Sequence, residues 1–207
     1  MPKDQHPPLN IILLGDPAAG KATHGKFLQQ KYRFYNLDMG KELRSLENNR
    51  TLRKKYSLDK TLDSGKLTPT QLVRQLLHHR IHSTAKNQGI LFNGTPKMLG
   101  EARLVSKWLK EEKRVNVLFL YLSIPLKETM RRMTSRKTYF RGKFSKRPDD
   151  TNRALQNRVA YYKKNIVQVV KFFKKLYPFV KISTIGTIPA ARKRLLKAME
   201  KFNYNFY

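Results

Sequence analysis

The segment from Gly15 to Thr23, which reads GDPAAGKAT, carries residue types that bind phosphate groups. Its glycines let successive backbone N–H groups curl around phosphate oxygens, and a helix that begins at its end adds a partial positive charge. Lys21 would reach the β- and γ-phosphates of a nucleoside triphosphate. The general pattern places Ser or Thr directly after this lysine, whereas Ala22 follows it here and the hydroxyl comes at Thr23. The competing interpretation is an ordinary strand–turn–helix with a surface lysine.

Arginines further along the chain form a second candidate set for phosphate chemistry. Arg132 and Arg136 are four residues apart, so they share one face of a helix. Arg147 and Arg158 follow them. Transfer of a phosphoryl group requires in-line positioning, neutralisation of phosphate charge and exclusion of water. One lysine and several arginines would supply the charge, although a solvated helix face is the alternative for any one pair.

Short apolar runs alternate with amphipathic stretches, and this alternation predicts the elements that position these residues. The expected strands cover residues 11–14, 89–92, 115–122 and 179–183. The expected helices cover about 21–31, 98–110 and 189–202, with a basic helix after Pro125. Strands that alternate with helices predict an α/β fold around a parallel sheet, with functional groups at the carboxyl ends of the strands. The segments 38–67 and 137–148 interrupt the alternation.

The charge of the chain is its most unusual property. Its 207 residues include 44 Lys and Arg against 14 Asp and Glu, which gives a formal net charge of +30. Such a field attracts polyanions, so nucleic acid, an anionic membrane surface and phosphorylated small molecules are candidate partners. Solvated surface is the alternative.

Other residue types exclude several classes of protein. The chain has no cysteine, which excludes disulfides, thiolate catalysis and cysteine-ligated zinc. No apolar run approaches the roughly 20 residues of a membrane span, and we expect a cytoplasmic protein. The five histidines show no metal pattern, so we expect them at the surface or hydrogen-bonded. Tyr161, Tyr162, Phe172 and Phe173 recur at helical spacing, which predicts core packing rather than base stacking.

Taken in order, the motifs resemble the adenylate kinase family. The hydroxyl displaced by one position in Gly-x-Pro-x-x-Gly-Lys-x-Thr is similar to its phosphate loop. Later segments also resemble the family in order and spacing, from about Asn10 to Met199. Residues 38–44 and 65–69 resemble the two ends of a nucleoside-monophosphate lid, and residues 93–97 with Glu101 and Ala102 resemble a further motif of the family. Arg132, Arg136 and Arg158, together with residues 147–150, resemble the arginine set of the ATP lid and the helix after it. Residues 186–189 resemble the late loop that contacts the adenine of ATP.

The resemblance implies reversible transfer of the terminal phosphoryl group from Mg-ATP to AMP, giving two ADP, with Mg²⁺ as the cofactor. It implies a three-layer P-loop kinase core with about five parallel strands. The implied organisation is a flexible segment 1–9 and a single kinase domain 10–207, with a helical monophosphate-binding insertion at about 38–67 and a short zinc-free lid at about 135–148. Closure of the lids would expel water that could otherwise hydrolyse ATP.

The resemblance also assigns roles to residues. The catalytic set is Lys21 on the β- and γ-phosphates and Arg132, Arg147 and Arg158 around the transferred group. The ATP-binding set is Gly15, Pro17, Ala18, Ala19, Gly20, Lys21, Ala22, Thr23, Arg132, Arg136, Gly186 and Ile188. The AMP-binding set is Met39, Gly40, Arg44, Lys66, Leu67, Thr68, Gly94, Lys97, Glu101, Arg147 and Arg158. The metal set is Asn93, acting through water, and Thr23.

Four residues depart from the family pattern. Ala18 replaces a glycine, and if this position has a positive φ, alanine costs on the order of 1 kcal/mol. Asn93 replaces the aspartate that orders magnesium-bound water, and it keeps hydrogen bonding without the charge. Lys97 replaces an arginine and loses the bidentate fork. Glu101 replaces a glutamine that reads adenine, and an ionised glutamate suits the donors of guanine better unless it is protonated or turned away.

These departures leave alternatives beside an ATP:AMP kinase. One is a nucleoside-monophosphate kinase for another base, such as GMP. Another is a weakly active or inactive protein of the same fold that binds RNA or ribosomes through its basic surface. We expect a monomer in either case.

Overall fold

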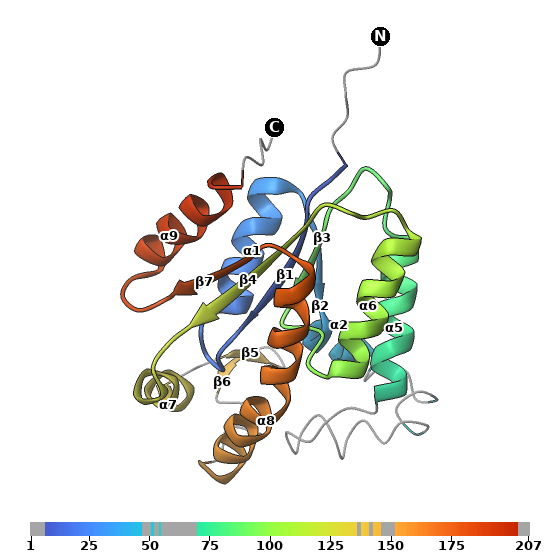
Figure 1. Cartoon of the computed structure of the whole chain (residues 1–207). Helices are drawn as coiled ribbons and strands as arrows, with labels where there is room; N and C mark the ends of the chain where they lie inside the picture. Colours follow the sequence, from blue (N-terminus) through green and yellow to red (C-terminus); the bar gives the residue numbers. More distant parts are fainter. Residues whose placement is uncertain are drawn as a thin grey trace.

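Five parallel strands form the central sheet of the computed structural model, which describes residues 7–46, 51, 54, 70–135, 138–140, 143–145 and 152–202 (Figure 1). The strand order across the sheet is β2-β3-β1-β4-β7. The bounds are Asn10–Gly15 for β1, Tyr35–Asp38 for β2, Ile90–Asn93 for β3, Val117–Ser123 for β4 and Phe179–Ser183 for β7. All four neighbouring pairs are parallel, so every carboxyl end reaches the same edge.

Helices cover both faces of the sheet and make the fold three-layered (Figure 1). Residues of α1 (Lys21–Tyr32) and α9 (Ile188–Glu200) belong to the core on one face. Residues of α5 (Thr70–Ser83), α6 (Leu99–Glu111) and α8 (Asn152–Leu176) belong to the core on the other. Two further helices follow strand ends: α2 (Met39–Ser45) begins directly after β2, and α7 (Leu126–Ser135) begins after β4 with two residues between them.

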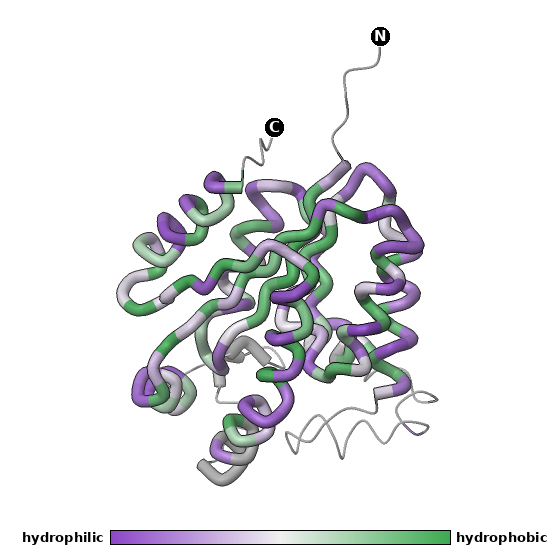
Figure 2. The backbone as a smooth tube through the Cα atoms, in the orientation of Figure 1, coloured by the Kyte–Doolittle hydropathy of each residue, from purple (hydrophilic) through white to green (hydrophobic). Residues whose placement is uncertain are grey.

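The central strand explains why both layers exist. Every residue of β1 is buried, with Ile12 and Leu14 in one core and Ile11 and Leu13 in the other. Successive side chains of a strand point to opposite faces, so an apolar run of this kind must be covered on both sides. Figure 2 shows hydrophobic residues concentrated along these inner strands. Burying the β1 aliphatic side chains contributes on the order of 2 kcal/mol each.

The predicted strands are confirmed with shifts of two residues or fewer, and the fold class is confirmed. The helices predicted at 21–31, 98–110 and 189–202 are present within about two residues of these bounds, and α7 follows Pro125 as expected. The sequence pattern did not place β2, whose short run YNLD mixes polar and apolar residues. Within the described residues, no helix is both long and apolar enough to cross a membrane.

The two interrupting segments are described only in part. In the first, α2 follows β2 directly, and residues 55–69 lie outside the described part of the chain. In the second, β5 (Thr138–Phe140) and β6 (Lys143–Ser145) form an antiparallel pair, which the sequence reading did not predict. The N-terminal residues 1–6 and the residues 136–137, 141–142 and 146–148 of the assigned lid are likewise not described.

Candidate functional site

The predicted phosphate loop is the turn between β1 and α1, at the carboxyl edge of the sheet. Gly20 precedes α1 with φ 86°, and within the described residues no side chain caps this helix. The first N–H groups of α1 are therefore available to an anion. Ala18 has φ 60°, which confirms the positive φ that its glycine-like position suggested. The Ala19 N–H donates to the Asp16 carbonyl at 3.1 Å and closes the turn.

The strained alanine carries a stability prediction. Left-handed backbone costs alanine roughly 1–2 kcal/mol, whereas glycine adds only about 0.4–1 kcal/mol of unfolded-state entropy. Ala18→Gly is therefore expected to raise the free energy of unfolding by about 0.5–1 kcal/mol in urea denaturation. The control is Ala22→Gly, which lies in the first turn of α1 and is expected to lower that free energy. A destabilised Ala18→Gly would contradict the strain argument.

Lys21 begins α1 and points back over the loop. Its Nζ donates to the Gly15 carbonyl at 2.7 Å and to the Asp16 carbonyl at 2.8 Å, and it lies 5.8 Å from the centre of the Tyr162 ring. Gly94 is next to it, because a Cβ added to Gly94 would lie 3.6 Å from the Lys21 Cε. The ammonium group thus stands between the phosphate loop and the loop that follows β3, to which the resemblance assigns the acceptor nucleotide.

A partly buried chain of hydrogen bonds supports the phosphate loop, and the sequence did not predict it. The Gly15 N–H donates to the Tyr162 hydroxyl at 3.2 Å, and Tyr162 and Tyr121 share a hydrogen bond. The Tyr121 hydroxyl donates to Asp16 Oδ1 at 2.8 Å, and the Ile124 N–H donates to Asp16 Oδ2 at 2.9 Å. Burial raises the pKa of both tyrosines, which keeps their protons on the hydroxyls. An acidic residue inside an anion-binding loop was the signal available in the sequence.

Asn93 ends β3 and is the candidate metal residue. It is 6% exposed, and its Nδ2 donates to the Asn36 Oδ1 at 3.2 Å. Gly25 of α1 leaves it room, because a Cβ there would lie 2.9 Å from the Asn93 Cγ. The amide nitrogen is therefore committed to Asn36, while the amide oxygen keeps acceptor capacity. Thr23, the other candidate, is exposed in the first turn of α1.

The donor set fits a metal that is held mainly by nucleotide phosphates. The described residues contain no group of three or more His, Asp or Glu side chains that could hold a metal ion by themselves. Mg²⁺ usually keeps several waters and uses substrate phosphates in place of a full protein cage. A buried amide that binds one of those waters is compatible with this coordination.

The acceptor side of the site centres on the start of α6. Glu101 is 4% exposed, and its Oε2 accepts hydrogen bonds from the N–H groups of Lys97 at 3.1 Å and Met98 at 3.3 Å. Burial raises the pKa of Glu101, while those two hydrogen bonds and the nearby charges of Lys97 and Arg74 oppose the shift. One carboxylate oxygen is thus turned onto the N-terminus of its own helix.

The remaining residues assigned to the nucleotides differ in burial, and several of them are not described. Met39 is buried and Gly40 half-buried at the start of α2, and Lys97 is exposed. The Arg44 side chain, Lys66, Leu67 and Thr68 lie outside the described residues, as do Arg136, Arg147 and the side chain of Arg158.

Arg132 is tied to the phosphate loop through Thr184. Its Nε donates to Glu128 Oε1 at 2.6 Å, and its Nη2 donates to the Thr184 carbonyl at 2.9 Å. The Thr184 hydroxyl in turn donates to the Ala19 carbonyl at 2.9 Å. Hydrogen bonds from Arg131 and then Arg132 lower the pKa of Glu128 to about 2. Gly186 and Ile188, the predicted ATP contacts, follow Thr184 and are exposed.

His24 contradicts the expectation of a surface or hydrogen-bonded histidine. It is 3% exposed, and its Nδ1 has no hydrogen-bond partner among the described residues. Its ring lies against the phosphate loop, since a Cβ added to Gly20 would be 3.2 Å from its Cδ2. Burial, followed by the charges of Arg192 and Arg132, lowers the pKa of His24. The imidazole is therefore neutral near pH 7, because a charged ring would be buried beside two guanidinium groups.

This lowered pKa predicts acid sensitivity. Below about pH 6.5 the His24 side chain is protonated in the unfolded chain but stays neutral in the folded chain until the pH reaches its lowered pKa. The free energy of unfolding therefore falls as the pH drops below about 6.5. For one group the slope is at most about 1.4 kcal/mol per pH unit. Urea unfolding at pH 7.5, 6.5 and 5.5 is expected to show a shallower loss in His24→Gln than in the unaltered chain. The exposed His79→Gln is the control, and an unchanged slope in His24→Gln would count against this origin.

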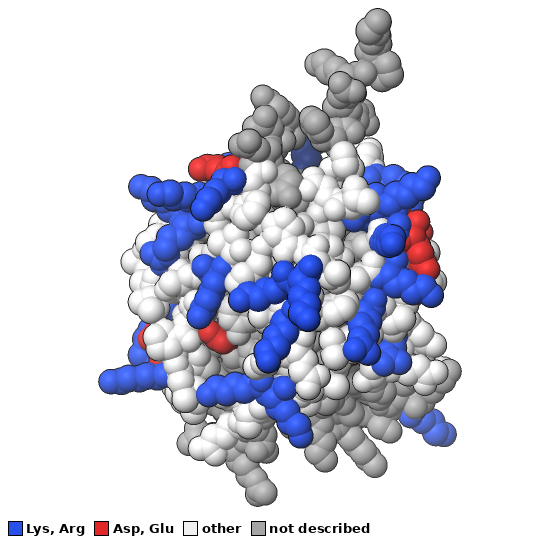
Figure 3. Space-filling model, viewed as in Figure 1, with Lys and Arg blue, Asp and Glu red and all other residues white. Residues whose placement is uncertain are grey.

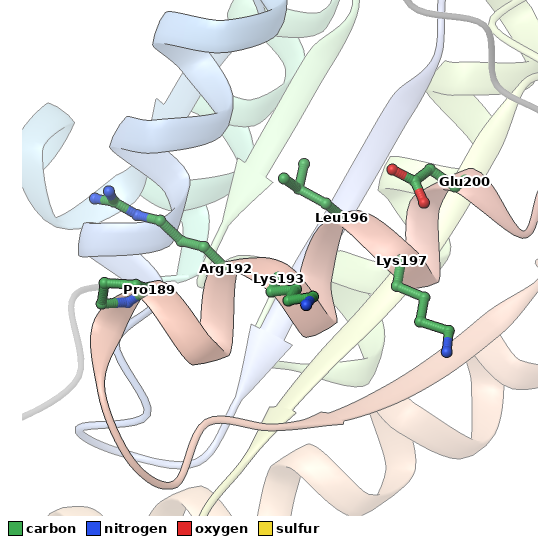
Figure 4. Close-up of a pocket in the computed structure, with 6 residues that line it drawn as sticks. All are labelled: Pro189, Arg192, Lys193, Leu196, Lys197 and Glu200. Carbon is green, nitrogen blue, oxygen red and sulfur yellow. The ribbon is translucent and has the colours of Figure 1, made fainter.

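The basic charge is spread widely over the surface and is not confined to this site. Figure 3 shows separate groups of Lys and Arg side chains across the viewed face and acidic ones at few places. A shallow pocket on α9, drawn in Figure 4, is lined by Pro189, Arg192, Lys193, Leu196, Lys197 and Glu200. Arg192 reaches from it to α1, where its guanidinium lies 4.6 Å from the centre of the Phe27 ring. None of the predicted site residues lines this pocket.

Comparison with known proteins agrees with this geometry. Residues 13–177 match the family model described as adenylate kinase. The chain is 30% identical to "Adenylate kinase" of Flavobacterium psychrophilum over 190 residues, which is 90% of this chain and 96% of that protein. It is 27% identical to "Adenylate kinase" of Phocaeicola vulgatus over 197 residues, 93% of this chain and 99% of that one. Because the family match spans most of the sequence and includes the phosphate loop, this chain belongs to the adenylate kinase family.

Proposed function

We propose that this protein reversibly transfers the terminal phosphoryl group of Mg-ATP to AMP, giving two ADP. The observation that carries the proposal is the position of Lys21, whose ammonium lies over the phosphate loop and beside Gly94 of the acceptor loop. Family membership, which makes the chain a phosphotransferase, supports it, as does a match to a whole adenylate kinase over 93% of this chain.

The residues of the loop would bind and orient the triphosphate. The N–H groups at the start of α1 would receive the β-phosphate at the positive end of the helix dipole. Lys21 would exchange its hydrogen bonds with the Gly15 and Asp16 carbonyls for phosphate oxygens. Arg132 would add a second positive charge on the side of Thr184. Charge placed in advance in this way lowers the barrier of phosphoryl transfer, which needs positioning more than covalent help.

Mg²⁺ bound with ATP would neutralise phosphate charge at this centre. Asn93 would hold one of the metal waters through its amide oxygen, and the Thr23 hydroxyl is the second candidate contact. The loss of the usual carboxylate charge at position 93 predicts a weaker requirement for this residue than in relatives that carry aspartate there.

Glu101 decides how well the acceptor base is recognised. Its Oε2 is occupied by the start of α6, and burial raises its pKa, so a protonated side chain would regain a donor for the N1 of adenine. Glu101→Gln restores that donor at every pH. We expect it to lower the KM for AMP by about threefold to tenfold at pH 8, with little change in kcat. A KM for GMP that rises in Glu101→Gln, with no improvement in the KM for AMP, would favour the guanine alternative.

A coupled assay tests the proposed function directly. ADP formation from ATP is measured with AMP, and AMP is then replaced in turn by GMP, CMP and UMP. Turnover with AMP well above the other three is the expected result. Absence of turnover with all four monophosphates would sink the proposal.

We also propose weak, salt-sensitive binding of nucleic acid to the basic surface, separate from the kinase site. The net charge of +30 supports it through release of counterions from a bound polyanion. Binding of an RNA oligonucleotide that weakens with added salt and survives Lys21→Ala is the expected result. The monomeric state and a cytoplasmic location stay predictions from the sequence.

A further inference from the structure

We propose that Tyr162 and Asp16 are positioning residues that set the shape of the phosphate loop and connect it to α8. The proposal rests on the proposed kinase function for its catalytic consequence. Neither residue belongs to the set that the family resemblance assigns to nucleotide binding.

The hydrogen bonds run in one direction from the loop to a carboxylate. The Gly15 N–H donates to Tyr162, Tyr162 shares a hydrogen bond with Tyr121, and Tyr121 donates to Asp16 Oδ1. Such a chain of hydroxyls is strengthened cooperatively when it ends on an anion and is partly shielded from water. Asp16 is that anion, and the Ile124 N–H holds its other oxygen at 2.9 Å.

The chain fixes the peptide groups that hold Lys21. Gly15 and Asp16 offer their carbonyls to the Lys21 ammonium, and Tyr162 and Leu122 accept the two N–H groups of the same residues at 3.2 Å and 2.9 Å. Because the N–H and the C=O groups of both residues are committed, the backbone of the loop has little freedom to tilt. The position of the lysine is therefore determined partly from beneath the loop.

The same hydrogen bonds also control the direction of the Asp16 carboxylate. A negative charge in a loop that receives a triphosphate would repel it. Tyr121 and the Ile124 N–H hold both oxygens of Asp16 toward β4 and the start of the β4–α7 connection. The same contacts that position the loop thus keep its one acidic side chain turned away from the phosphate-binding face.

Tyr162 links this loop to the helix that bears the assigned Arg158. The two positions are one helical turn apart on α8, so they share a face of that helix. A shift of α8 would therefore move the Tyr162 hydroxyl and change its hydrogen bond with the Gly15 N–H. This gives Tyr162 a role in coupling the two halves of the reaction centre.

The test compares two neighbouring tyrosines of α8. Tyr162→Phe keeps the ring beside Lys21 and removes the hydroxyl from the chain. Tyr161→Phe is the matched control, because its hydroxyl contacts Met98 Sδ at 2.7 Å and not the loop. Tyr162→Phe is expected to lower kcat about tenfold and to weaken binding of a fluorescent N-methylanthraniloyl ATP about threefold, while the KM for AMP stays within about twofold. Tyr161→Phe is expected to leave kcat and ATP affinity within about twofold.

A double-variant cycle separates positioning from simple loss of stability. Asp16→Asn leaves either the Tyr121 hydroxyl or the Ile124 N–H without its acceptor, because an amide has one acceptor oxygen where the carboxylate has two. Combined with Tyr162→Phe, it is expected to cost no more than about twice the larger single effect on ATP affinity. Independent, multiplicative effects, or equal behaviour of Tyr162→Phe and Tyr161→Phe, would overturn the proposal. Absence of turnover in the unaltered chain would refute the proposed function, while the ATP-affinity measurements still decide on Tyr162 and Asp16.

Discussion

Lys21→Ala is expected to reduce kcat roughly a thousandfold, the largest effect of any single substitution considered. The ammonium lies between the phosphate loop and Gly94, and under the proposed function this is where charge would develop during phosphoryl transfer. No neighbouring lysine on α1 replaces it, because the next one, Lys26, is exposed and more than one turn further along the helix. The measurement is steady-state ADP formation from ATP and AMP at saturation.

Lys26→Ala supplies the control for this substitution. It removes the same charge from the same helix at an exposed position, and it is expected to leave kcat within about twofold. The free energy of unfolding of both variants in urea should be similar to that of the unaltered chain, since neither lysine side chain belongs to a hydrophobic core cluster. If Lys21→Ala retained a tenth or more of the turnover, the assignment of this loop as the phosphate cradle would fail.

Arg132→Ala is expected to lower kcat/KM for ATP roughly a hundredfold. The guanidinium donates to Glu128 and to the Thr184 carbonyl, and Thr184 holds the Ala19 carbonyl of the phosphate loop. Its removal takes away one positive charge beside the loop and one support of the loop. The loss should fall on ATP more than on AMP, because these contacts lie on the α7 and β7 side of the site.

Arg131→Ala tests whether the ion pair with Glu128 alone explains that effect. Arg131 pairs with the same carboxylate at 2.7 Å, but its side chain is 68% exposed, against 23% for Arg132. An exposed pair of this kind contributes little, so Arg131→Ala is expected to change kcat/KM by less than about threefold. Equal losses in the two variants would falsify the role assigned to Arg132.

The elements that carry the site were predictable because their signals are local. An apolar run followed by a glycine-rich turn and a helix places Lys21 within a span of a dozen residues, and the structure differs from the predicted bounds by no more than two residues. The strand β2 escaped prediction because only Leu37 within it is buried and its other three residues are polar or half-exposed. The hairpin of β5 and β6 escaped because three-residue strands carry almost no periodicity.

The supporting contacts of the site could not be predicted from the sequence. Tyr162 satisfied the helical periodicity of a core residue, and nothing in its neighbours along the chain indicated that its hydroxyl meets Gly15, 147 residues away. His24 has the spacing of an ordinary helix residue, yet it is buried beside Arg192 and Arg132. The base of the acceptor also depended on which way Glu101 turns, which its residue type left open.

The amino-acid sequence alone is enough to predict the phosphate loop, the alternation of strands and helices, and the family, because glycine geometry, hydropathy period and motif order are encoded over short spans. The folded chain is needed to show which tyrosine supports the loop, which of two adjacent arginines faces it, and where the Asp16 carboxylate points. Those choices depend on side chains that meet across the sheet from distant positions, and the sheet packing that brings them together is a property of the whole chain.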